Sequence, residues 1–342
     1  MAKTKQAGSA AQRRAQERQQ RQRRDEGRAS VLAKGKNVGR GPNIYRRKDR
    51  SRLYMIIGVL ALIVVIIGVL IYISQLPATG QKATPADQSV LAQLKGVPQS
   101  TWEAIGKGSP TVNNVLKAQS GQPPLKGPNG HPEFFYVGAE YCPNCAAERW
   151  AMINALDRFG TFKDLGQIVS AETPVSTFTF VGSSYTSQYI DFVPREILGN
   201  TQDSSGSWAA LDKLTPAQQQ NFVKYNNQMA FPFVNIGNQY VAVGANYLYT
   251  VLQDNGSAIS WQDIASTLTN TKSPIAQGIL GTANYMTAAI CSVTDQQPST
   301  VCGSSVIQQI QQSLPPTSNT ASNSSLALMP ADLLAAQRRT LG

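Results

Sequence analysis

The sequence predicts an α/β domain that follows a single transmembrane helix. Residues 53–73 form an uncharged apolar run, and segments typical of strands alternate with segments typical of helices after it. A Cys-Pro-Asn-Cys sequence at 142–145 stands where a predicted strand gives way to a predicted helix. Because such alternation is typical of layered α/β domains, we expect one here, with a helical insertion and a C-terminal helical extension.

The apolar run of residues 53–73 contains 21 residues without a charge. As an α-helix it spans about 31 Å, enough to cross the hydrocarbon core of a bilayer. A signal-peptide core usually has about 7–15 apolar residues, so we interpret the run as a retained single-pass anchor. Five basic residues precede it directly: Arg46, Arg47, Lys48, Arg50 and Arg52. They favour a cytoplasmic N-terminus and an extracytoplasmic main domain at the cell membrane.

The positive charge of the chain lies in its N-terminal arm. Residues 1–52 hold 17 Lys/Arg and 4 Asp/Glu, which leaves 14 of the 31 basic and 16 of the 20 acidic residues for the rest. The arm has few large apolar residues, so we predict disorder. It either sets topology as a solvated tail or attracts anionic lipid headgroups, with RNA contact as a third alternative. We expect no nucleic-acid partner for the folded part.

The chain is predicted to have five segments. They are a basic disordered cytoplasmic arm (1–52), a transmembrane helix (53–73), a linker (74–90), an extracytoplasmic domain (91–314) and a disordered tail (315–342). Within the domain, strands are predicted over residues 133–138, 176–181, 189–193, 233–236 and 240–243. Helices are predicted over 146–159, ended by Gly160, and over 261–268, 275–290 and 306–314. The segment 207–229 is predicted to be a helical insertion.

The Cys142-Pro143-Asn144-Cys145 sequence is the main chemical signal. A thiolate is the nucleophile in disulfide exchange, and the N-terminus of a helix stabilises a negative charge. Pro143 suits the first position of a helix that starts beside Cys142. Cys145, one turn later, lies where it can resolve a mixed disulfide. Cys142 and Cys145 are therefore the predicted catalytic pair. Half of a zinc site and a purely structural disulfide are the alternatives.

The residues around this pair resemble the thioredoxin-like superfamily. Ala139-Glu140-Tyr141 before Cys142 is similar to its active-site strand end, and Phe231-Pro232-Phe233 is similar to its cis-proline segment. Residues 240–245, YVAVGA, resemble the hairpin strand that follows. The resemblance implies a thioredoxin-like fold, with an insertion over 182–230 and a cis Pro232 beside the cysteines. It also implies substrate contacts by Phe231, Pro232, Tyr141, Pro143 and Asn144.

A longer resemblance covers roughly residues 80–310. The phrases FFYVGAEYCPNCAAERWA, YTSQYIDFVPREI and TANYMTAAICSVTDQQPSTVC look like members of the domain-of-unknown-function family 929, a group of archaeal and bacterial membrane proteins. This chain departs from thioredoxin itself, because Tyr136 stands where thioredoxin has a buried carboxylate. The direction of electron flow therefore does not carry over. Glu140 is expected at the surface, as a proton-transfer group or a solvated charge.

Cys291 and Cys302 flank a turn-rich loop between two predicted helices. A disulfide between them closes a loop of about 12 residues, which is worth about 3 kcal/mol in the chain-entropy model. We expect a structural disulfide, and a second redox pair is the alternative. Trp102, Trp150, Trp208 and Trp261 are expected in the core. Asp191 and Glu196 have no partner that the sequence identifies.

These features predict a membrane-anchored thiol–disulfide oxidoreductase that acts on protein disulfides. It needs no bound cofactor and no metal, and it exchanges electrons with a partner, for which a membrane-embedded thiol carrier is one candidate. Two rivals remain at this stage. One is a non-catalytic binding module with structural disulfides, and the other is a cysteine-based carrier for metal or haem maturation.

Overall fold

The structure is a computed structural model that describes residues 18, 21, 50–74, 82–108 and 116–315. The chain divides into two units, Met1–Ile73 and Ser74–Gly342, and each is treated by itself. The predicted disordered arm lies outside the described residues except at residues 18, 21 and 50–52, and the predicted tail lies outside them except at residue 315.

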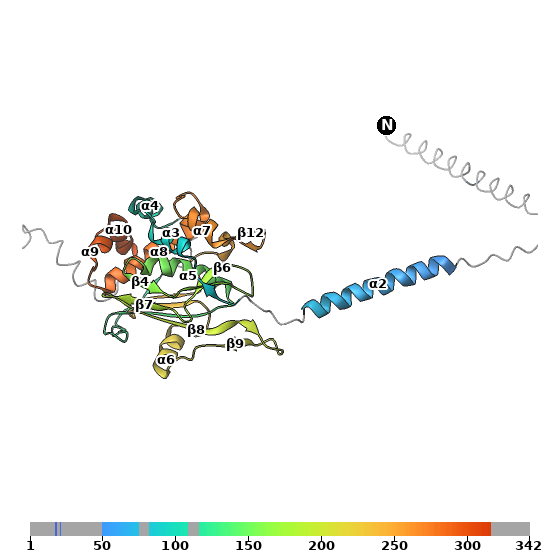
Figure 1. Cartoon of the computed structure of the whole chain (residues 1–342), viewed down its shortest axis with the longest axis horizontal. Helices are drawn as coiled ribbons and strands as arrows, with labels where there is room; N and C mark the ends of the chain where they lie inside the picture. Colours follow the sequence, from blue (N-terminus) through green and yellow to red (C-terminus); the bar gives the residue numbers. More distant parts are fainter. Residues whose placement is uncertain (1–17, 19–20, 22–49, 75–81, 109–115, 316–342) are drawn as a thin grey trace, which may run out of the picture. The chain divides into compact units, whose positions relative to one another are not determined.

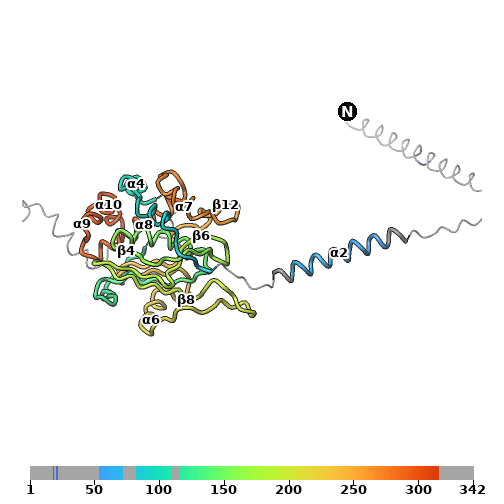
Figure 2. Tube along the Cα trace, viewed as in Figure 1, coloured from blue at the N-terminus to red at the C-terminus, as the bar shows by residue number. Residues whose placement is uncertain are grey.

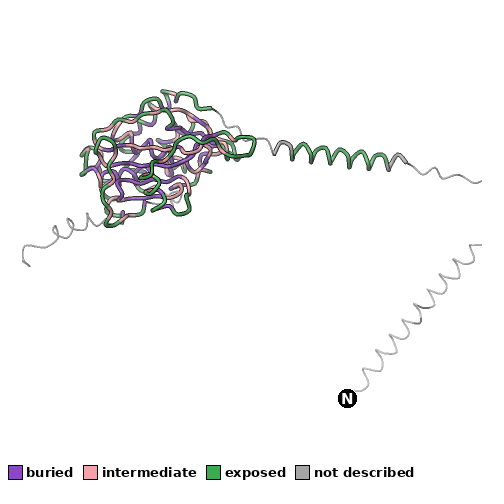
Figure 3. The backbone as a smooth tube through the Cα atoms, turned by 90° about the horizontal axis from the view of Figure 1, so that it is seen from below, coloured by how far each residue is buried: buried purple, intermediate pink, exposed green. Residues whose placement is uncertain are grey.

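The first unit contains the helix α2 (Arg50–Ser74). Its segment Tyr54–Ile71 has a mean hydropathy of 3.2, and none of it is buried in the structure (Figure 3). Among the described residues, this is the one helix that is long and apolar enough to cross a membrane. The helix is apolar on all sides, which is typical of a helix surrounded by lipid and not of one that lies half-buried on the surface of a globular domain.

The second unit is built on short strands. The strands are β1 (Thr84–Pro85), β2 (Lys117–Ala118), β3 (Glu133–Ala139), β4 (Gly160–Lys163), β5 (Gly166–Val169), β6 (Ser176–Thr179), β7 (Ser184–Ser187), β8 (Asp191–Gln202), β9 (Trp208–Ala210), β10 (Phe233–Ile236), β11 (Tyr240–Val243), β12 (Gln253–Asp254) and β13 (Ser257–Ala258). The largest sheet has six strands in the order β2-β11-β10-β3-β8-β9. Its β3 and β8 are parallel, and its other neighbours are antiparallel.

Helices follow and precede these strands. They are α3 (Gln88–Lys95), α4 (Gln99–Ile105), α5 (Pro143–Leu156), α6 (Pro216–Tyr225), α7 (Trp261–Thr267), α8 (Pro274–Val293), α9 (Ser299–Cys302) and α10 (Ser305–Ser313), with a 3-10 turn at Tyr249–Leu252. The mixture of helices and sheets confirms the α/β class.

The six-stranded sheet is covered on both faces, because side chains alternate along each strand. On β3, Phe134 and Tyr136 join the large core that includes α5 and α8. Phe135 and Val137 point the other way and pack with Phe222 of α6. Figure 1 shows α6 on one side of the sheet and α5 and α8 on the other. Because β3 is buried on both faces, its sequence is a nearly continuous apolar run, and this run predicted the strand.

The N-terminal and C-terminal helices of this unit lie side by side. Helix α3 packs against α7, α4 packs against α8, and Figure 2 places α4, in cyan, next to the red α10. The contact of α4 with α8 is close, because the backbone of Gly108 lies directly against Gly281. A Cβ atom at residue 281 would stand 2.7 Å from Gly108 Cα, so a glycine is required there.

Several predicted boundaries differ from the structure. The segment 182–230 is mainly β structure, since β7, β8 and β9 precede the single helix α6. The strand expected over 189–193 runs on to Gln202, because it pairs with β3 and then β9. The predicted linker ends earlier than residue 90, since β1 pairs with β5 and α3 begins at Gln88. The helix expected over 146–159 ends at Leu156, and Gly160 starts β4.

Candidate functional site

Cys142 stands between the central strand and the helix that follows it. β3 ends at Ala139, and Cys142 is the N-cap of α5 with extended backbone angles. Its Sγ atom accepts a hydrogen bond from the backbone N–H of Cys145, at 3.3 Å. Pro143 occupies the first helical position, where its missing N–H costs nothing. The local sequence therefore aims free backbone donors of the helix at one sulfur atom.

The two cysteines differ in access to solvent. Cys142 is 7% exposed and Cys145 is 0% exposed, and neither forms a disulfide. They are separated by one helical turn, so a bond between their sulfurs needs only a local movement. Both residues are therefore largely buried, and Cys142 is the one that keeps some contact with solvent.

The surroundings of the pair also separate the two thiols electrostatically. A hydrogen bond from the Cys145 thiol lowers the pKa of Cys142, with help from the backbone N–H of Cys145 and the positive charge of Arg149. Complete burial raises the pKa of Cys145 well above the usual value. Cys142 is thus the thiol that ionises first, which is the order that a nucleophile and a resolving cysteine need.

A buried ion pair lies beneath the cysteines. Arg149 of α5 donates to Glu196 of β8 through Nε, at 2.7 Å from Oε1, and through Nη2, at 2.8 Å from Oε2. Arg149 is 0% exposed and Glu196 is 1% exposed. Burial is the largest single effect and lowers the pKa of Arg149, but Glu196, Tyr136 and Cys145 together raise it above the usual value, so the guanidinium keeps its charge. The sequence left Glu196 without a partner, and this is the partner.

Tyr136 adds a hydroxyl group to the same buried region. Burial raises the pKa of Tyr136 well above the usual value, and its hydroxyl oxygen has no hydrogen-bond partner. The ring lies over Gly138, where a Cβ atom would collide with the tyrosine hydroxyl. Gly138 is therefore needed for Tyr136 to reach towards the end of β3.

Glu140 is not at the surface, contrary to the prediction. It is 8% exposed, and its Oε1 accepts a hydrogen bond from Thr179 at 2.6 Å. Burial raises the pKa of Glu140, while the Thr179 hydroxyl and Arg149 lower it. The strand end that leads to Cys142 carries this side chain inwards because the Glu140 N–H bonds to the Leu198 carbonyl.

The predicted substrate contacts lie around Cys142. Tyr141 and Phe231 pack against the cluster of Ala139, Cys142 and Cys145 and remain partly exposed. The Phe231–Pro232 peptide bond is cis, and Phe233 pairs with Val137, so this segment lies beside the end of β3. Pro143 and Asn144 are the helix residues between the cysteines, and Asn144 is the more exposed of the two.

The comparisons with known proteins give one family. Residues 124–292 match the model of the family described as Domain of unknown function (DUF929). The DUF929 match begins before β3 and ends within α8, so it includes both cysteines of the site, Arg149, Glu196 and Pro232. No curated protein and no solved structure matches the chain.

The second cysteine pair is bonded in the structure. Cys291, in α8, forms a disulfide with Cys302, in α9, and their Cα atoms are 5.5 Å apart. Cys302 lies beyond the DUF929 match. The residues are 0% and 1% exposed, so a soluble thiol has little access to this bond. These positions fit the predicted structural role.

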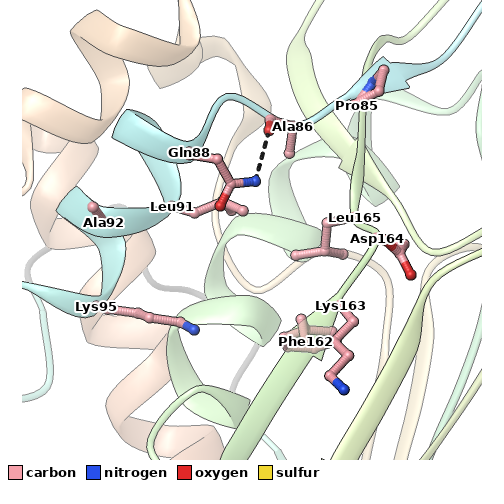
Figure 4. Close-up of a pocket in the computed structure, with 10 residues that line it drawn as sticks. All are labelled: Pro85, Ala86, Gln88, Leu91, Ala92, Lys95, Phe162, Lys163, Asp164 and Leu165. Carbon is pink, nitrogen blue, oxygen red and sulfur yellow. Dashed lines mark hydrogen bonds between the residues drawn. The ribbon is translucent and has the colours of Figure 1, made fainter.

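Two pockets of the described domain lie away from the cysteines. One, of about 480 Å³, opens between α3 and the β4–β5 turn and is lined by Leu91, Lys95 and Phe162, among others (Figure 4). Another, of about 610 Å³, includes Lys126 and His131. Neither is lined by a residue of the cysteine site. Over the described part of the chain, no group of three or more His, Cys, Asp and Glu side chains is placed to hold a metal ion.

The sequence reasoning missed two residues of the site. It did not single out Arg149, whereas it did place Tyr136 at the position where thioredoxin has a buried carboxylate. Trp208, expected in the core, is partly exposed and stacks on Tyr141 instead. Its position after the polar run 203–207 is the one local signal that could have identified it as a residue of an exposed hairpin.

Proposed function

We propose that this chain is a membrane-anchored thiol–disulfide oxidoreductase of the thioredoxin-like type, acting on protein disulfides. One observation carries the proposal. Cys142 caps α5, and its sulfur accepts a hydrogen bond from the Cys145 N–H. Cys145 lies one helical turn after Cys142 on α5. The lowered pKa of Cys142, the more exposed of the two thiols, and the raised pKa of Cys145 support an attacking and a resolving role.

The reaction needs only the two thiols and a substrate disulfide. The Cys142 thiolate attacks one sulfur of the substrate, so that a mixed disulfide forms and the other substrate sulfur leaves as a thiolate. Cys145 then loses its proton and attacks the Cys142 sulfur. The Cys142–Cys145 disulfide forms, the second substrate thiolate leaves, and two electrons have passed to the substrate. A dithiol donor must reduce the pair again, and the same steps reversed oxidise a substrate dithiol.

Several features of the domain support a thioredoxin-like fold. The strand that ends before the cysteines is central in its sheet and parallel to β8, while β10 and β11 form an antiparallel hairpin on its other side. α5 covers one face of this sheet. Since β8 belongs to that plan, β7 before it and β9 and α6 after it would be additions.

The proposed location follows from α2 and from the residues before it. A helix of this length and composition suits a bilayer, and the cluster of arginine and lysine ahead of it suits the cytoplasmic side. The domain with the cysteines would then be outside the cytoplasm, where disulfides persist. A membrane-embedded thiol carrier is the class of partner that could renew the dithiol.

A redox titration tests the function. The full chain, purified in detergent, is equilibrated in glutathione buffers of graded potential, quenched with an alkylating reagent and analysed by peptide mass spectrometry at each cysteine. We expect Cys142–Cys145 to titrate between about −270 and −120 mV, and Cys291–Cys302 to stay oxidised, since structural disulfides usually lie below about −300 mV.

The variant Cys145→Ser is the matched control, because it keeps the reachable thiol but cannot form the internal disulfide. In this variant Cys142 should form only a mixed disulfide with glutathione. A wild-type pair that stays fully oxidised, or that never forms an internal disulfide, contradicts the proposal. It would leave a binding module as the better interpretation.

A further inference from the structure

The buried charges beneath the cysteines carry an inference that rests on the proposed function and goes beyond it. We propose that Arg149 and Glu196 form a positioning pair for the cysteine site. In this role, Arg149 holds the end of β3 against the first turn of α5 and places a positive charge that favours the Cys142 thiolate. Glu196 holds Arg149 in that orientation.

Arg149 and Cys142 both donate a hydrogen bond to one backbone carbonyl group. Arg149 Nη2 donates to the Ala139 carbonyl oxygen at 2.8 Å, and the backbone N–H of Cys142 donates to the same oxygen at 3.3 Å. Ala139, Cys142 and Cys145 also pack together in one cluster. The guanidinium thus binds the backbone group from which the loop with Cys142 starts.

The positive charge of Arg149 lies on the same helix as the two cysteines. Arg149 follows Cys145 by four residues on α5, so their side chains lie on one face of the helix. Its Nη1 atom is buried and has no hydrogen-bond partner, although Nε and Nη2 are both engaged. Glu196 and Ala139 therefore fix Nε and Nη2 of the guanidinium, and the N–H groups of Nη1 make no hydrogen bond. The positive charge lies in a buried region, where an electrostatic interaction is stronger at a given distance than it is in water.

A bulge in β8 lies next to Glu196. β3 and β8 are parallel with Gly138 opposite Glu196, but the next pair joins Ala139 to Leu198, so β8 has an extra residue there. Such bulges redirect side chains beside functional sites. Here the bulge follows the residue whose carboxylate faces α5, and the bidentate contact with Arg149 fixes both side chains.

A purely structural role explains this pair less well. The loss of hydration offsets most of the attraction within a buried ion pair, so an apolar pair of similar volume often serves stability equally well. The titratable groups that face the Cys142 region are Cys145 and Arg149 of α5, Tyr136 of β3, Glu196 of β8, and Glu140 and Tyr141 of the connecting loop. Arg149 is the cation among these groups, and its charge lowers the pKa of Cys142.

The test measures how fast Cys142 is alkylated as a function of pH. The full chain in detergent is reduced, freed of reductant, treated with iodoacetamide and analysed at each cysteine by mass spectrometry. The variants are Arg149→Met with Glu196→Leu, Glu196→Gln alone, and Arg149→Lys. Arg195→Met is the matched control, because Arg195 lies next to Glu196 on β8 but bonds to Gln218 of α6.

The two principal variants should differ, because the double variant should raise the alkylation midpoint of Cys142 and Glu196→Gln should not. The Arg149→Met/Glu196→Leu double variant removes the cation without leaving a buried charge unpaired, so the midpoint for Cys142 should rise. Its alkylation rate below that midpoint should fall by about threefold or more, since one pKa unit changes the thiolate fraction tenfold there. Glu196→Gln keeps the cation and should leave the midpoint unchanged or lower it. Arg149→Lys should give a midpoint between those of the wild type and the double variant, because lysine keeps the positive charge but cannot make the two-point contact of Arg149 with Glu196.

A double variant that is folded by circular dichroism and has the wild-type midpoint overturns the inference. If that variant does not fold, Glu196→Gln decides, because a raised midpoint for Cys142 would contradict the proposed role. A shift in Arg195→Met as large as in the double variant would also contradict it. Failure of the proposed function is separate: it appears as a wild-type pair that does not exchange in glutathione buffers, whatever these alkylation profiles are.

Discussion

The ring of Tyr141 lies parallel to the indole ring of Trp208, with 4.2 Å between the ring centroids and 2° between the planes. Tyr141 directly precedes Cys142. Trp208 is the first residue of β9, which is an edge strand of the six-stranded sheet. Both side chains are partly exposed. The β8–β9 hairpin therefore places an aromatic pair next to Cys142, where the proposed protein substrate would make contact.

We expect Trp208→Ala to weaken the reaction with protein disulfides. Stacked aromatic pairs contribute about 0.5–1.5 kcal/mol, so kcat/KM should fall by about two- to tenfold. The measurement compares the reduction of insulin with that of glutathione disulfide, which is too small to need the aromatic surface. Only the insulin reaction should be affected.

Val223→Ala is the control for this prediction, since Val223 is an exposed apolar residue on α6. It should leave both reactions at the wild-type rate. An equal loss with both disulfides in Trp208→Ala would mean that Trp208 acts through the structure of the cysteine loop rather than through substrate contact.

The two cysteines should give different products when they are replaced singly. Cys145→Ser leaves the reachable Cys142 able to attack but removes the resolving thiol, so a mixed disulfide with the substrate should accumulate. Cys142→Ser leaves only the fully buried Cys145, and no adduct should form. Non-reducing gels of each full-length variant after incubation with insulin measure the adduct. Equal trapping by both variants would refute the assignment of attacker and resolver.

Glu148 should make stability fall as the pH rises through the weakly acidic range. It is fully buried on α5 and accepts hydrogen bonds from the Asn246 backbone and side chain, and burial raises its pKa from 4.5 to about 7. A carboxyl group with a raised folded-state pKa contributes stability below its unfolded pKa and loses it as pH rises to the folded value. The loss between pH 4.5 and about 7 is about 3 kcal/mol for this group.

Thermal unfolding of the wild type and of Glu148→Gln at pH 5 and pH 8 measures this dependence. The variant should unfold at more nearly equal temperatures at the two pH values, because its side chain does not ionise. Glu103→Gln, at an exposed position of α4, is the control and should keep the wild-type difference. Glu148→Gln with an unchanged difference would assign the pH dependence to other buried carboxyls, such as Glu133 with its pKa raised by burial to about 7.

Removal of the second cysteine pair should affect stability and leave the chemistry unchanged. The bond joins residues 11 apart, and the chain-entropy model assigns a loop of this size about 3 kcal/mol. The Cys291→Ala/Cys302→Ala variant should therefore unfold at lower denaturant concentration. Its Cys142 alkylation profile and its rate of insulin reduction should match the wild type. Lost turnover with unchanged stability would favour a second redox pair instead.

Local signals predicted the parts of the fold that depend on local sequence. The hairpin of β10 and β11 was predicted with the bounds found, because Gly237 and Asn238 both adopt positive φ angles, 61° and 59°, that few other residues accept. The start of α5 was predicted from Pro143, which suits only the first turn of a helix. These signals operate within a few residues, so one sequence suffices to find them.

The parts that were missed depend on contacts between distant residues. Arg149 and Glu196 are 47 residues apart, and their contact requires both the parallel register of β3 with β8 and the bulge in β8. β8 itself was cut short in the prediction, because Pro194 and Glu196 are uncommon inside a buried strand. The burial of Glu140 has the same origin, since its environment is set by Thr179 and Leu198 from two other strands.

Four cysteines can form two disulfides in three ways, and the spacing of this chain favours one of them. The paired residues are 3 and 11 positions apart, whereas each crossed pairing must bridge more than about 140 residues of chain. Neither the Cys291–Cys302 bond nor the proposed Cys142–Cys145 bond links distant parts of the domain. Without either bond, the strand order is held by packing alone. Reoxidation has only short loops to close, so scrambled isomers should be scarce even where thiols are repeatedly exchanged.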